Sequence, residues 1–215
     1  MFGTARSAAL RYVASDMWKP YLRVINRFAN TAVHVLDRFH IVAKLNKAID
    51  EVRAGEARKL AAQGYTILKN TRWCFLKKLK NLTSSQKLKL NDVMRFDLLT
   101  VRAYNLAQIF GALWEHRSPT WASRFIDGWT ANVMRSRIPA LKKFARTLRN
   151  HKPLILNWFR AKGLVSSAVV EALNSNAKFA IRTARGFRTF DALETALFHR
   201  PGQLPEPILF THRFW

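Results

Sequence analysis

Two short runs of β-branched and aromatic residues lie near the start of the chain, at residues 11–15 and 32–36, and each is followed directly by an aspartate, Asp16 or Asp37. Runs of this length and composition are typical of buried strands. The segment between them has helical periodicity, with Asp16 placed to cap it and Pro20 in the first turn, where a missing N–H is tolerated. We therefore predict a strand–helix–strand unit with parallel strands and with both aspartates at the carboxyl ends.

After His40 the hydrophobic positions follow a helical period almost throughout. The predicted helices cover residues 17–28, 41–63, 72–78, 84–94 and 98–114, a segment that begins at Pro119, and residues 138–148, 153–161, 166–182 and 190–198. We expect residues from about Ile41 to Lys162 to be almost entirely helical. The residues from Arg200 onwards contain three prolines, which favours an extended tail.

The balance of these elements predicts a mainly α protein with a small α/β part. Two strands are too few for an independent sheet. If the strand–helix–strand prediction holds, the other strands of that sheet lie outside these 215 residues.

The charge of the chain is strongly basic, with 37 Lys and Arg against 13 Asp and Glu and a formal net charge of +24. This favours nucleic acid as the partner over an acidic membrane surface, because the basic residues are spread over many segments. No apolar run has the length of a membrane span, and residues 1–10 lack the apolar stretch of a secretory signal. Cys74 is the only cysteine. That excludes an internal disulfide or a cysteine-based zinc site within the chain and fits a reducing cytoplasm.

One acidic residue, Glu171, stands between Gly128 and Phe190 among thirteen Lys and Arg. A carboxylate in such a field can hold a divalent metal against a phosphate, or it can cap a helix or pair with an arginine. Helical spacing places it in one polar stripe with four other residues: Asn174, Lys178, Arg182 and Arg185. The stripe suits a metal ligand followed by phosphate contacts; the alternative is an ordinary solvated face.

Two further features have both a functional and a structural interpretation. Asp37 and His40 lie one turn apart where the second strand gives way to a helix. Zinc is possible there, but no second pair of ligands is in view, so a buried Asp–His hydrogen bond is the preferred interpretation. Trp73 follows Arg72 in a basic segment and, if exposed, can stack on an unpaired base. A tryptophan beside Phe75 is more often part of the core.

Several ordered motifs resemble one family. They are residues 15–21 (SDMWKPY), 32–40 (AVHVLDRFH), 47–53 (KAIDEVR), 71–73 (TRW), 169–174 (VVEALN), 186–190 (GFRTF), 204–207 (LPEP) and 211–214 (THRF). Together they are similar to the DDE transposases of bacterial insertion sequences, and most similar to the group called ISL-three. The resemblance covers nearly the whole chain.

The resemblance implies a catalytic core with an RNase H-like fold, interrupted by a helical insertion. It divides the chain into a partial core at 1–40, the insertion at 41–165, helices that return to the core at 166–198, and a tail at 199–215. It implies cleavage and strand transfer at transposon ends with Mg²⁺ or Mn²⁺.

The resemblance also assigns residues. The family's second aspartate falls on Asp16, with Asp37 as the alternative, its final glutamate on Glu171, and its Asp-x-x-His signature on Asp37 and His40. The resemblance thus implies a catalytic role for these four residues. Asp16 and Glu171 are the implied metal ligands, so we expect them to lie close together. The expected DNA contacts are Lys178, Arg182, Arg185, Arg188, Arg72 and Trp73.

The chain also departs from the family pattern. The family's first aspartate belongs on an earlier strand, yet no Asp or Glu precedes Asp16. The family's zinc-binding and helix-turn-helix modules are also absent from these residues. We therefore expect the C-terminal part of a transposase, inactive alone, in the bacterial cytoplasm with the nucleoid. The alternative is a non-catalytic, basic DNA-binding protein that interferes with an intact transposase. In either case we expect the protein partner of this chain to be a second copy of itself or an intact transposase.

Overall fold

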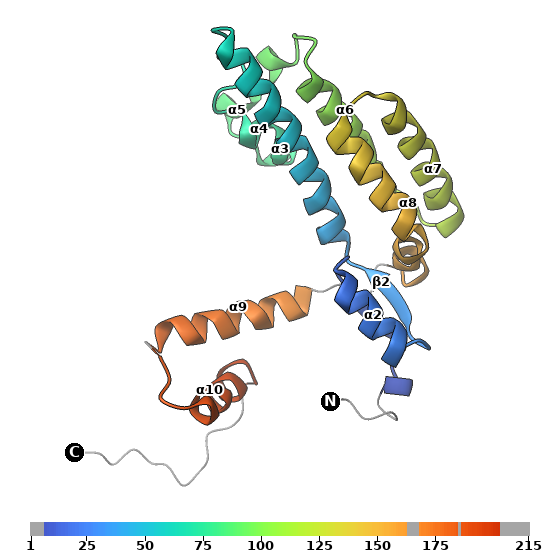
Figure 1. Cartoon of the computed structure of the whole chain (residues 1–215), viewed down its shortest axis with the longest axis vertical. Helices are drawn as coiled ribbons and strands as arrows, with labels where there is room; N and C mark the ends of the chain where they lie inside the picture. The colour runs from blue at the N-terminus through green and yellow to red at the C-terminus, as the bar shows by residue number, and fades with distance from the viewer. Residues whose placement is uncertain (1–6, 163–167, 185, 203–215) are drawn as a thin grey trace, which may run out of the picture. The chain divides into compact units, whose positions relative to one another are not determined.

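The structure, a computed structural model, describes residues 7–162, 168–184 and 186–202. The chain divides into two compact units, Met1–Ser166 and Ser167–Trp215. Within the described residues, the first unit holds a small sheet and a helical bundle, and the second holds two helices (Figure 1).

The sheet consists of strand β1 (Tyr12–Ser15) and strand β2 (Val33–Leu36), which pair in parallel and place Ser15 opposite Leu36. Helix α2 (Lys19–Phe28) connects them. The last two residues of β2 have no exposed surface, as the apolar run predicts. The predicted strand–helix–strand unit is confirmed, and each strand begins one residue later than expected.

The start of α2 differs from the prediction. Trp18 is its N-cap and makes no side-chain capping bond, whereas Pro20 does lie in the first turn. Asp16 lies two residues before the cap, and its Oδ1 accepts a hydrogen bond from the Trp18 N–H at 2.9 Å. The prediction that Asp16 caps the helix is therefore wrong, because a turn separates the end of the strand from the helix. The Asp16 carboxylate instead stabilises that turn through its hydrogen bond with the Trp18 N–H.

The rest of the first unit is helical. Its elements are α3 (Arg38–Ala62), α4 (Arg72–Leu76), the 3-10 helix η1 (Leu79–Asn81), α5 (Ser84–Val93), α6 (Leu99–Gly111), the 3-10 helix η2 (Ala112–Glu115), α7 (Pro119–Arg135) and α8 (Pro139–Arg160). Residues 41–162, all of which are described, contain no strand, so the predicted helical region is confirmed. None of the described helices is both long and apolar enough to cross a membrane.

Helix α3 is the common element of the bundle. Figure 1 shows α4 and α5 on one side of it and α6, α7 and α8 on the other, with the sheet at the end where α3 begins. Helices α6 and α8 both pack against α3, and α8 also packs against α7 and β2. The bundle is therefore joined to the sheet by α8, which packs against β2, and by α3, which follows β2 directly in the chain.

Aromatic side chains from α6, α7 and α8 form the centre of the bundle. The buried ring of Phe110 lies 4.8 Å from that of Trp129 and 5.6 Å from that of Phe144, measured between centroids. Such pairs contribute about 0.5–1.5 kcal/mol beyond the burial of their area. The Trp129 Nε1–H donates to the Leu106 carbonyl at 2.8 Å, so this buried indole keeps its hydrogen bond.

Helix α8 is continuous although its interior contains Pro153. The sequence predicted two helices with a break at residues 150–152, and that prediction is wrong. A proline inside a helix costs about 3 kcal/mol or more. Here Pro153 is exposed, whereas Leu148 and Ile155 on either side of it are fully buried. Packing of this apolar side against α3, α7 and β2 holds both halves of the helix in line.

The second unit contains α9 (Ala168–Thr183) and α10 (Phe190–Gly202), which pack against each other. Helix α10 runs past its predicted end, so the extended tail expected from Arg200 is wrong for residues 200–202. Residues 203–215 of the predicted tail lie outside the described residues.

Glu56 on α3 holds the start of α6. Its Oε1 accepts a hydrogen bond from the Leu99 N–H at 2.8 Å, and its Oε2 accepts from the Thr100 N–H at 2.8 Å and the Thr100 hydroxyl at 2.6 Å. The carboxylate satisfies donors that a helix N-terminus leaves open and places a negative charge at the positive end of the α6 dipole.

Replacing this carboxylate is expected to destabilise the bundle. Glu56→Ala should lower the free energy of unfolding by about 1–2 kcal/mol, because it leaves the donors of α6 without an acceptor. Urea unfolding followed by far-ultraviolet circular dichroism measures the change. Glu51→Ala is the matched control, because Glu51 is exposed on the same helix and forms no hydrogen bond or ion pair with another described residue. Its effect should stay within about 0.5 kcal/mol; equal losses in the two variants would contradict the capping role.

Candidate active site at the carboxyl edge of the sheet

The carboxyl ends of β1 and β2 lie side by side. Because the strands are parallel, Asp16 and Asp37 leave the same edge of the sheet. The Asp37 N–H donates to the Ser15 carbonyl at 2.9 Å, which ties the two segments together just where the aspartates stand. The sequence therefore predicted correctly that both aspartates lie at this edge.

Asp37 is held by the start of α3. It is the N-cap of that helix, its Oδ1 accepts from the Phe39 N–H at 2.8 Å, and only 5% of the residue is exposed. Asp37 and His40 each have a further interaction partner. The hydrogen bond expected between these two side chains stays a prediction.

Asp16 stands in a more open position. It is half-buried, and beyond the bond to the Trp18 N–H its carboxylate forms no hydrogen bond with another described residue. It lines a depression of about 380 Å³ together with His40, Lys44 and Lys47. Asp16 and His40 thus face one space, and Asp37 is not among the residues that line it.

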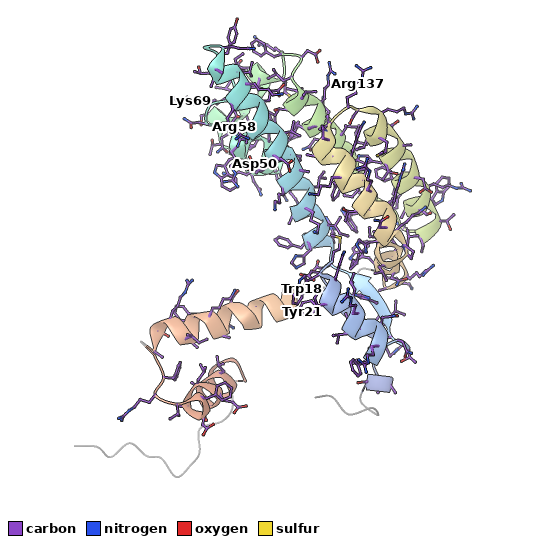
Figure 2. All side chains as sticks on the ribbon, in the orientation of Figure 1. Trp18, Tyr21, Asp50, Arg58, Lys69 and Arg137 are labelled. Carbon is purple, nitrogen blue, oxygen red and sulfur yellow. The ribbon has the colours of Figure 1, made fainter. Side chains whose placement is uncertain are left out.

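An aromatic pair stands at the rim of this depression. Trp18 is among the lining residues, and its ring packs edge-on against Tyr21 with centroids 4.8 Å apart. Both residues are more than half exposed, and Figure 2 shows them together at the sheet end of the first unit. Sequence reasoning gave this pair no role.

His34 of β2 and nearby His151 of α8 lie where the sheet meets the bundle, and sequence reasoning missed them too. His34 in β2 shares a hydrogen bond of 2.7 Å between its Nε2 and the Ser15 Oγ, and its carbonyl accepts from the Asn157 Nδ2–H on α8 at 2.7 Å. Burial lowers the pKa of His34, and the charge of nearby His151 lowers it further. Burial likewise lowers the pKa of His151, with an added contribution from Lys44. The only signal in the sequence was a titratable residue in the middle of an apolar strand.

The described side chains do not by themselves form a magnesium site. Among them no group of three or more His, Cys, Asp or Glu lies close enough to share an ion. The depression offers one carboxylate and one imidazole, whereas Mg²⁺ prefers oxygen ligands in an octahedral set. The zinc alternative at Asp37 and His40 likewise lacks a second pair of ligands among the described residues.

The second group of expected site residues belongs to the other unit. Glu171 lies in α9, but its side chain is outside the described part of the structure, as is Arg185. Lys178, Arg182 and Arg188 are exposed. The expected proximity of Asp16 and Glu171 joins two separate units and stays a prediction.

Trp73 lies at the surface, contrary to the preferred interpretation of the sequence. It is 53% exposed, while Phe75, two residues later, is buried. The short helix α4 turns Cys74 and Phe75 inward and therefore leaves its other side to solvent. The Arg72 guanidinium lies over the Trp73 ring at 5.2 Å and pairs with Asp50 of α3 at 3.1 Å. Arg72 and Trp73 thus present a cation and an aromatic ring together, and the Asp50 carboxylate of α3 holds the Arg72 guanidinium. We call these two residues the Arg72–Trp73 site.

Comparison with known proteins places this geometry in a family context. Residues 1–197 match the model of an ISL3-type DDE family described as "Transposase". The chain is similar to the transposase for insertion sequence element IS1001 of Bordetella parapertussis, with 30% identity over 182 residues that are 83% of this chain and 44% of that protein. It is also similar to the transposase for IS1557 of Mycobacterium tuberculosis, with 25% identity over an alignment of 227 residues, 93% of this chain and 50% of that protein. The chain spans about half the length of these curated relatives. No solved structure matches it.

The histidine pair makes stability at mildly acidic pH testable. Because the pKa values of His34 and His151 are lowered in the folded state from their ordinary value of 6.5, the unfolded chain binds more protons just below that pH. Their contribution to stability is therefore full above about pH 6.5 and is lost as the pH falls through the folded pKa values.

The urea midpoint should accordingly fall as the pH is lowered from about 7.5 to about 5, before most carboxylates titrate. His151→Gln, which removes one of the two imidazoles, should flatten the fall. An unchanged pH profile in both His151→Gln and His34→Gln would show that this pair does not couple the sheet to α8.

Proposed function

Because this chain belongs to the ISL3 family of DDE transposases, we propose that it supplies two of the catalytic carboxylates of a transposase, Asp16 and Glu171. The activity of the whole enzyme would be metal-dependent cleavage of DNA at transposon ends followed by strand transfer. The observation that carries the proposal is the position of Asp16, at the carboxyl end of β1 and on the same depression as His40. Ligands in open α/β sheets gather at this edge.

The architecture proposed for the intact protein is an RNase H-like core with a helical insertion. Its parts are residues 1–40, the insertion 41–165, the returning helices 166–198 and the tail 199–215. The parallel strand–helix–strand unit and the wholly helical character of residues 41–162 support this division. A two-stranded sheet gains stability when further strands extend it, which supports the expectation of a larger core.

Asp16 is a better candidate than Asp37 for the second aspartate of the site. The carboxylate of Asp37 is buried and engaged at the start of α3, whereas Asp16 is half-buried beside a depression. We assign Asp37 and His40 to positioning: Asp37 fixes the first turn of α3, and that turn carries His40 to the wall of the depression.

Mg²⁺ or Mn²⁺ is the cofactor that fits this chemistry, since such ions activate a water or 3′-hydroxyl and stabilise the leaving oxygen of a phosphodiester. Asp16 and Glu171 are the carboxylates of this chain that we propose as ligands. No Asp or Glu precedes Asp16 in the sequence, and we propose no residue of 1–215 as the family's first aspartate. We therefore propose that these residues do not cleave DNA alone.

A second candidate function needs no metal. The net charge of +24 and the missing third carboxylate are also what a basic, non-catalytic DNA-binding protein would have, one that interferes with an intact transposase by sharing its DNA or its subunits. In both cases the proposed DNA contacts include exposed Lys178, Arg182 and Arg188, together with Arg185 and the Arg72–Trp73 site. Either protein would work in the bacterial cytoplasm, at the nucleoid.

Manganese binding separates the two candidates. The chain should bind Mn²⁺ weakly, and Asp16→Asn or Glu171→Gln should lower that affinity at least about tenfold, because each removes a charged ligand. Asparagine at position 16 keeps an oxygen that can accept from the Trp18 N–H, so the turn is retained. Asp97→Asn is the control, since Asp97 is an exposed partner of Arg102 far from the sheet edge in sequence. Mn²⁺ affinity that Asp16→Asn leaves unchanged would favour the non-catalytic protein.

A cleavage assay with the same variants tests the divided site. A duplex carrying a transposon end should stay intact with residues 1–215 and Mg²⁺ or Mn²⁺. Cleavage that appears with this chain alone and disappears in Glu171→Gln would show that residues 1–215 complete their own active site, contrary to the proposal.

A further inference from the structure

The depression beside Asp16 continues between α3 and α8. Lys44 and Lys47 of α3 line it, and the same two lysines line a second depression of about 190 Å³. Lys143 and Thr147 of α8 form the opposite wall of that second depression. Because the two depressions share Lys44 and Lys47 of α3, we treat them as one groove, with Asp16 and His40 at one end and Lys143 at the other.

Helical spacing places cations along this groove. Lys44 and Lys47 are three residues apart on α3, so they lie on one side of the helix. Lys143, Thr147 and His151 recur every four residues on α8 and lie on one side of that helix as well. Helices α3 and α8 pack against each other, and residues of both line the second depression, so the two sides are close together.

The lysines of the groove are available for an external anion. Lys44, Lys47 and Lys143 are exposed, and none forms a salt bridge with another residue that the structure describes. One carboxylate, that of Glu51, lines the second depression with them. The groove therefore has a cationic stretch next to Asp16 and a single acidic position farther along α3.

We propose that this groove, defined by Lys44, Lys47 and Lys143, binds the phosphate backbone of the DNA strand whose end reaches Asp16. The proposal rests on the proposed function for the destination of that strand. Lysines are compact point charges that bind phosphate without reading bases, so the contact is independent of sequence. It is separate from the DNA contacts proposed on α9 and α4. Glu51 repels phosphate and marks the far limit of the cationic stretch.

A charge-matched pair of triple variants tests the groove. The groove variant carries Lys44→Gln, Lys47→Gln and Lys143→Gln. The control variant carries Lys59→Gln, Lys69→Gln and Lys87→Gln, which are also exposed and lower the net charge by the same amount. Figure 2 shows Lys69 toward the end of the first unit opposite to Trp18. Glutamine keeps a side chain of similar length, and circular dichroism checks that both variants fold.

Fluorescence anisotropy with a labelled duplex, at several salt concentrations and without divalent ions, gives the result. The groove variant should bind at least about tenfold more weakly than the control, and its plot of log affinity against log salt should be shallower by roughly one unit for each phosphate that the variant no longer binds. Glu51→Gln should bind somewhat more tightly than the wild type, a change that a purely structural role would not produce. Equal decreases in affinity in the two triple variants would overturn the proposal, since general attraction by a basic protein would then explain the binding.

The same measurements separate this inference from the proposed function. Asp16→Asn should bind DNA at least as tightly as the wild type in the absence of metal, because the lysines of the groove remain and a carboxylate that repels phosphate is removed. If the groove variant fails to bind DNA while Mn²⁺ affinity is insensitive to Asp16→Asn, the groove proposal is supported and the catalytic assignment of Asp16 is rejected. If Mn²⁺ affinity depends on Asp16 while the two triple variants bind DNA equally, the catalytic assignment is supported and the groove proposal is rejected.

Discussion

The parallel pairing of β1 with β2 is the constraint on which the rest of the site depends. It brings the segments after both strands to one edge, where the Asp37 N–H bonds to the Ser15 carbonyl at 2.9 Å. The chain then enters α3 at once, because Asp37 caps that helix with its own carboxylate. The direction of α3 is thereby fixed at the sheet, and so is the position of each residue that α3 presents, from His40 at the edge to Lys47 along the groove.

Several carboxylates of the first unit are occupied in holding helices together, whereas the Asp16 carboxylate accepts, among the described residues, only from the Trp18 N–H two residues later. Asp50 joins α3 to α4 through Arg72 at 3.1 Å, and Asp127 joins α7 to α8 through Lys152 at 2.6 Å. Because 37 Lys and Arg stand against 13 Asp and Glu, many lysines and arginines have no acid to pair with and can meet phosphate. The excess of basic over acidic residues therefore accounts both for the few carboxylates near the sheet edge and for the many lysines beside them.

The sequence predicted what depends on local pattern. Apolar runs ending in Asp16 and Asp37 indicated the two strands, and the helical period after His40 indicated the bundle. It failed where distant packing decides: α8 stays continuous across Pro153 because the residues on either side of it are buried by other elements. The exposure of Trp73 follows from which side of a five-residue helix meets α3, which spacing alone does not specify.

The site was predictable to the same extent. The shared edge of the two aspartates followed from parallel strands. The separation of roles, with Asp37 capping and Asp16 on the depression, depended on a turn of two residues after β1 that the pattern did not reveal. His34 and His151 are far apart in the chain, and no local signal indicates that they lie near each other.

Anomalous diffraction from crystals of this chain grown with Mn²⁺ and a transposon-end duplex tests the central claim most directly, because it locates the ion and its ligands together. The account predicts a manganese peak bonded to a carboxylate oxygen of Asp16, with Glu171 in the same coordination sphere and a phosphate beside it. Manganese bound elsewhere, with the Asp16 and Glu171 carboxylates too far apart to share an ion, would contradict the assignment of these two residues to one active site.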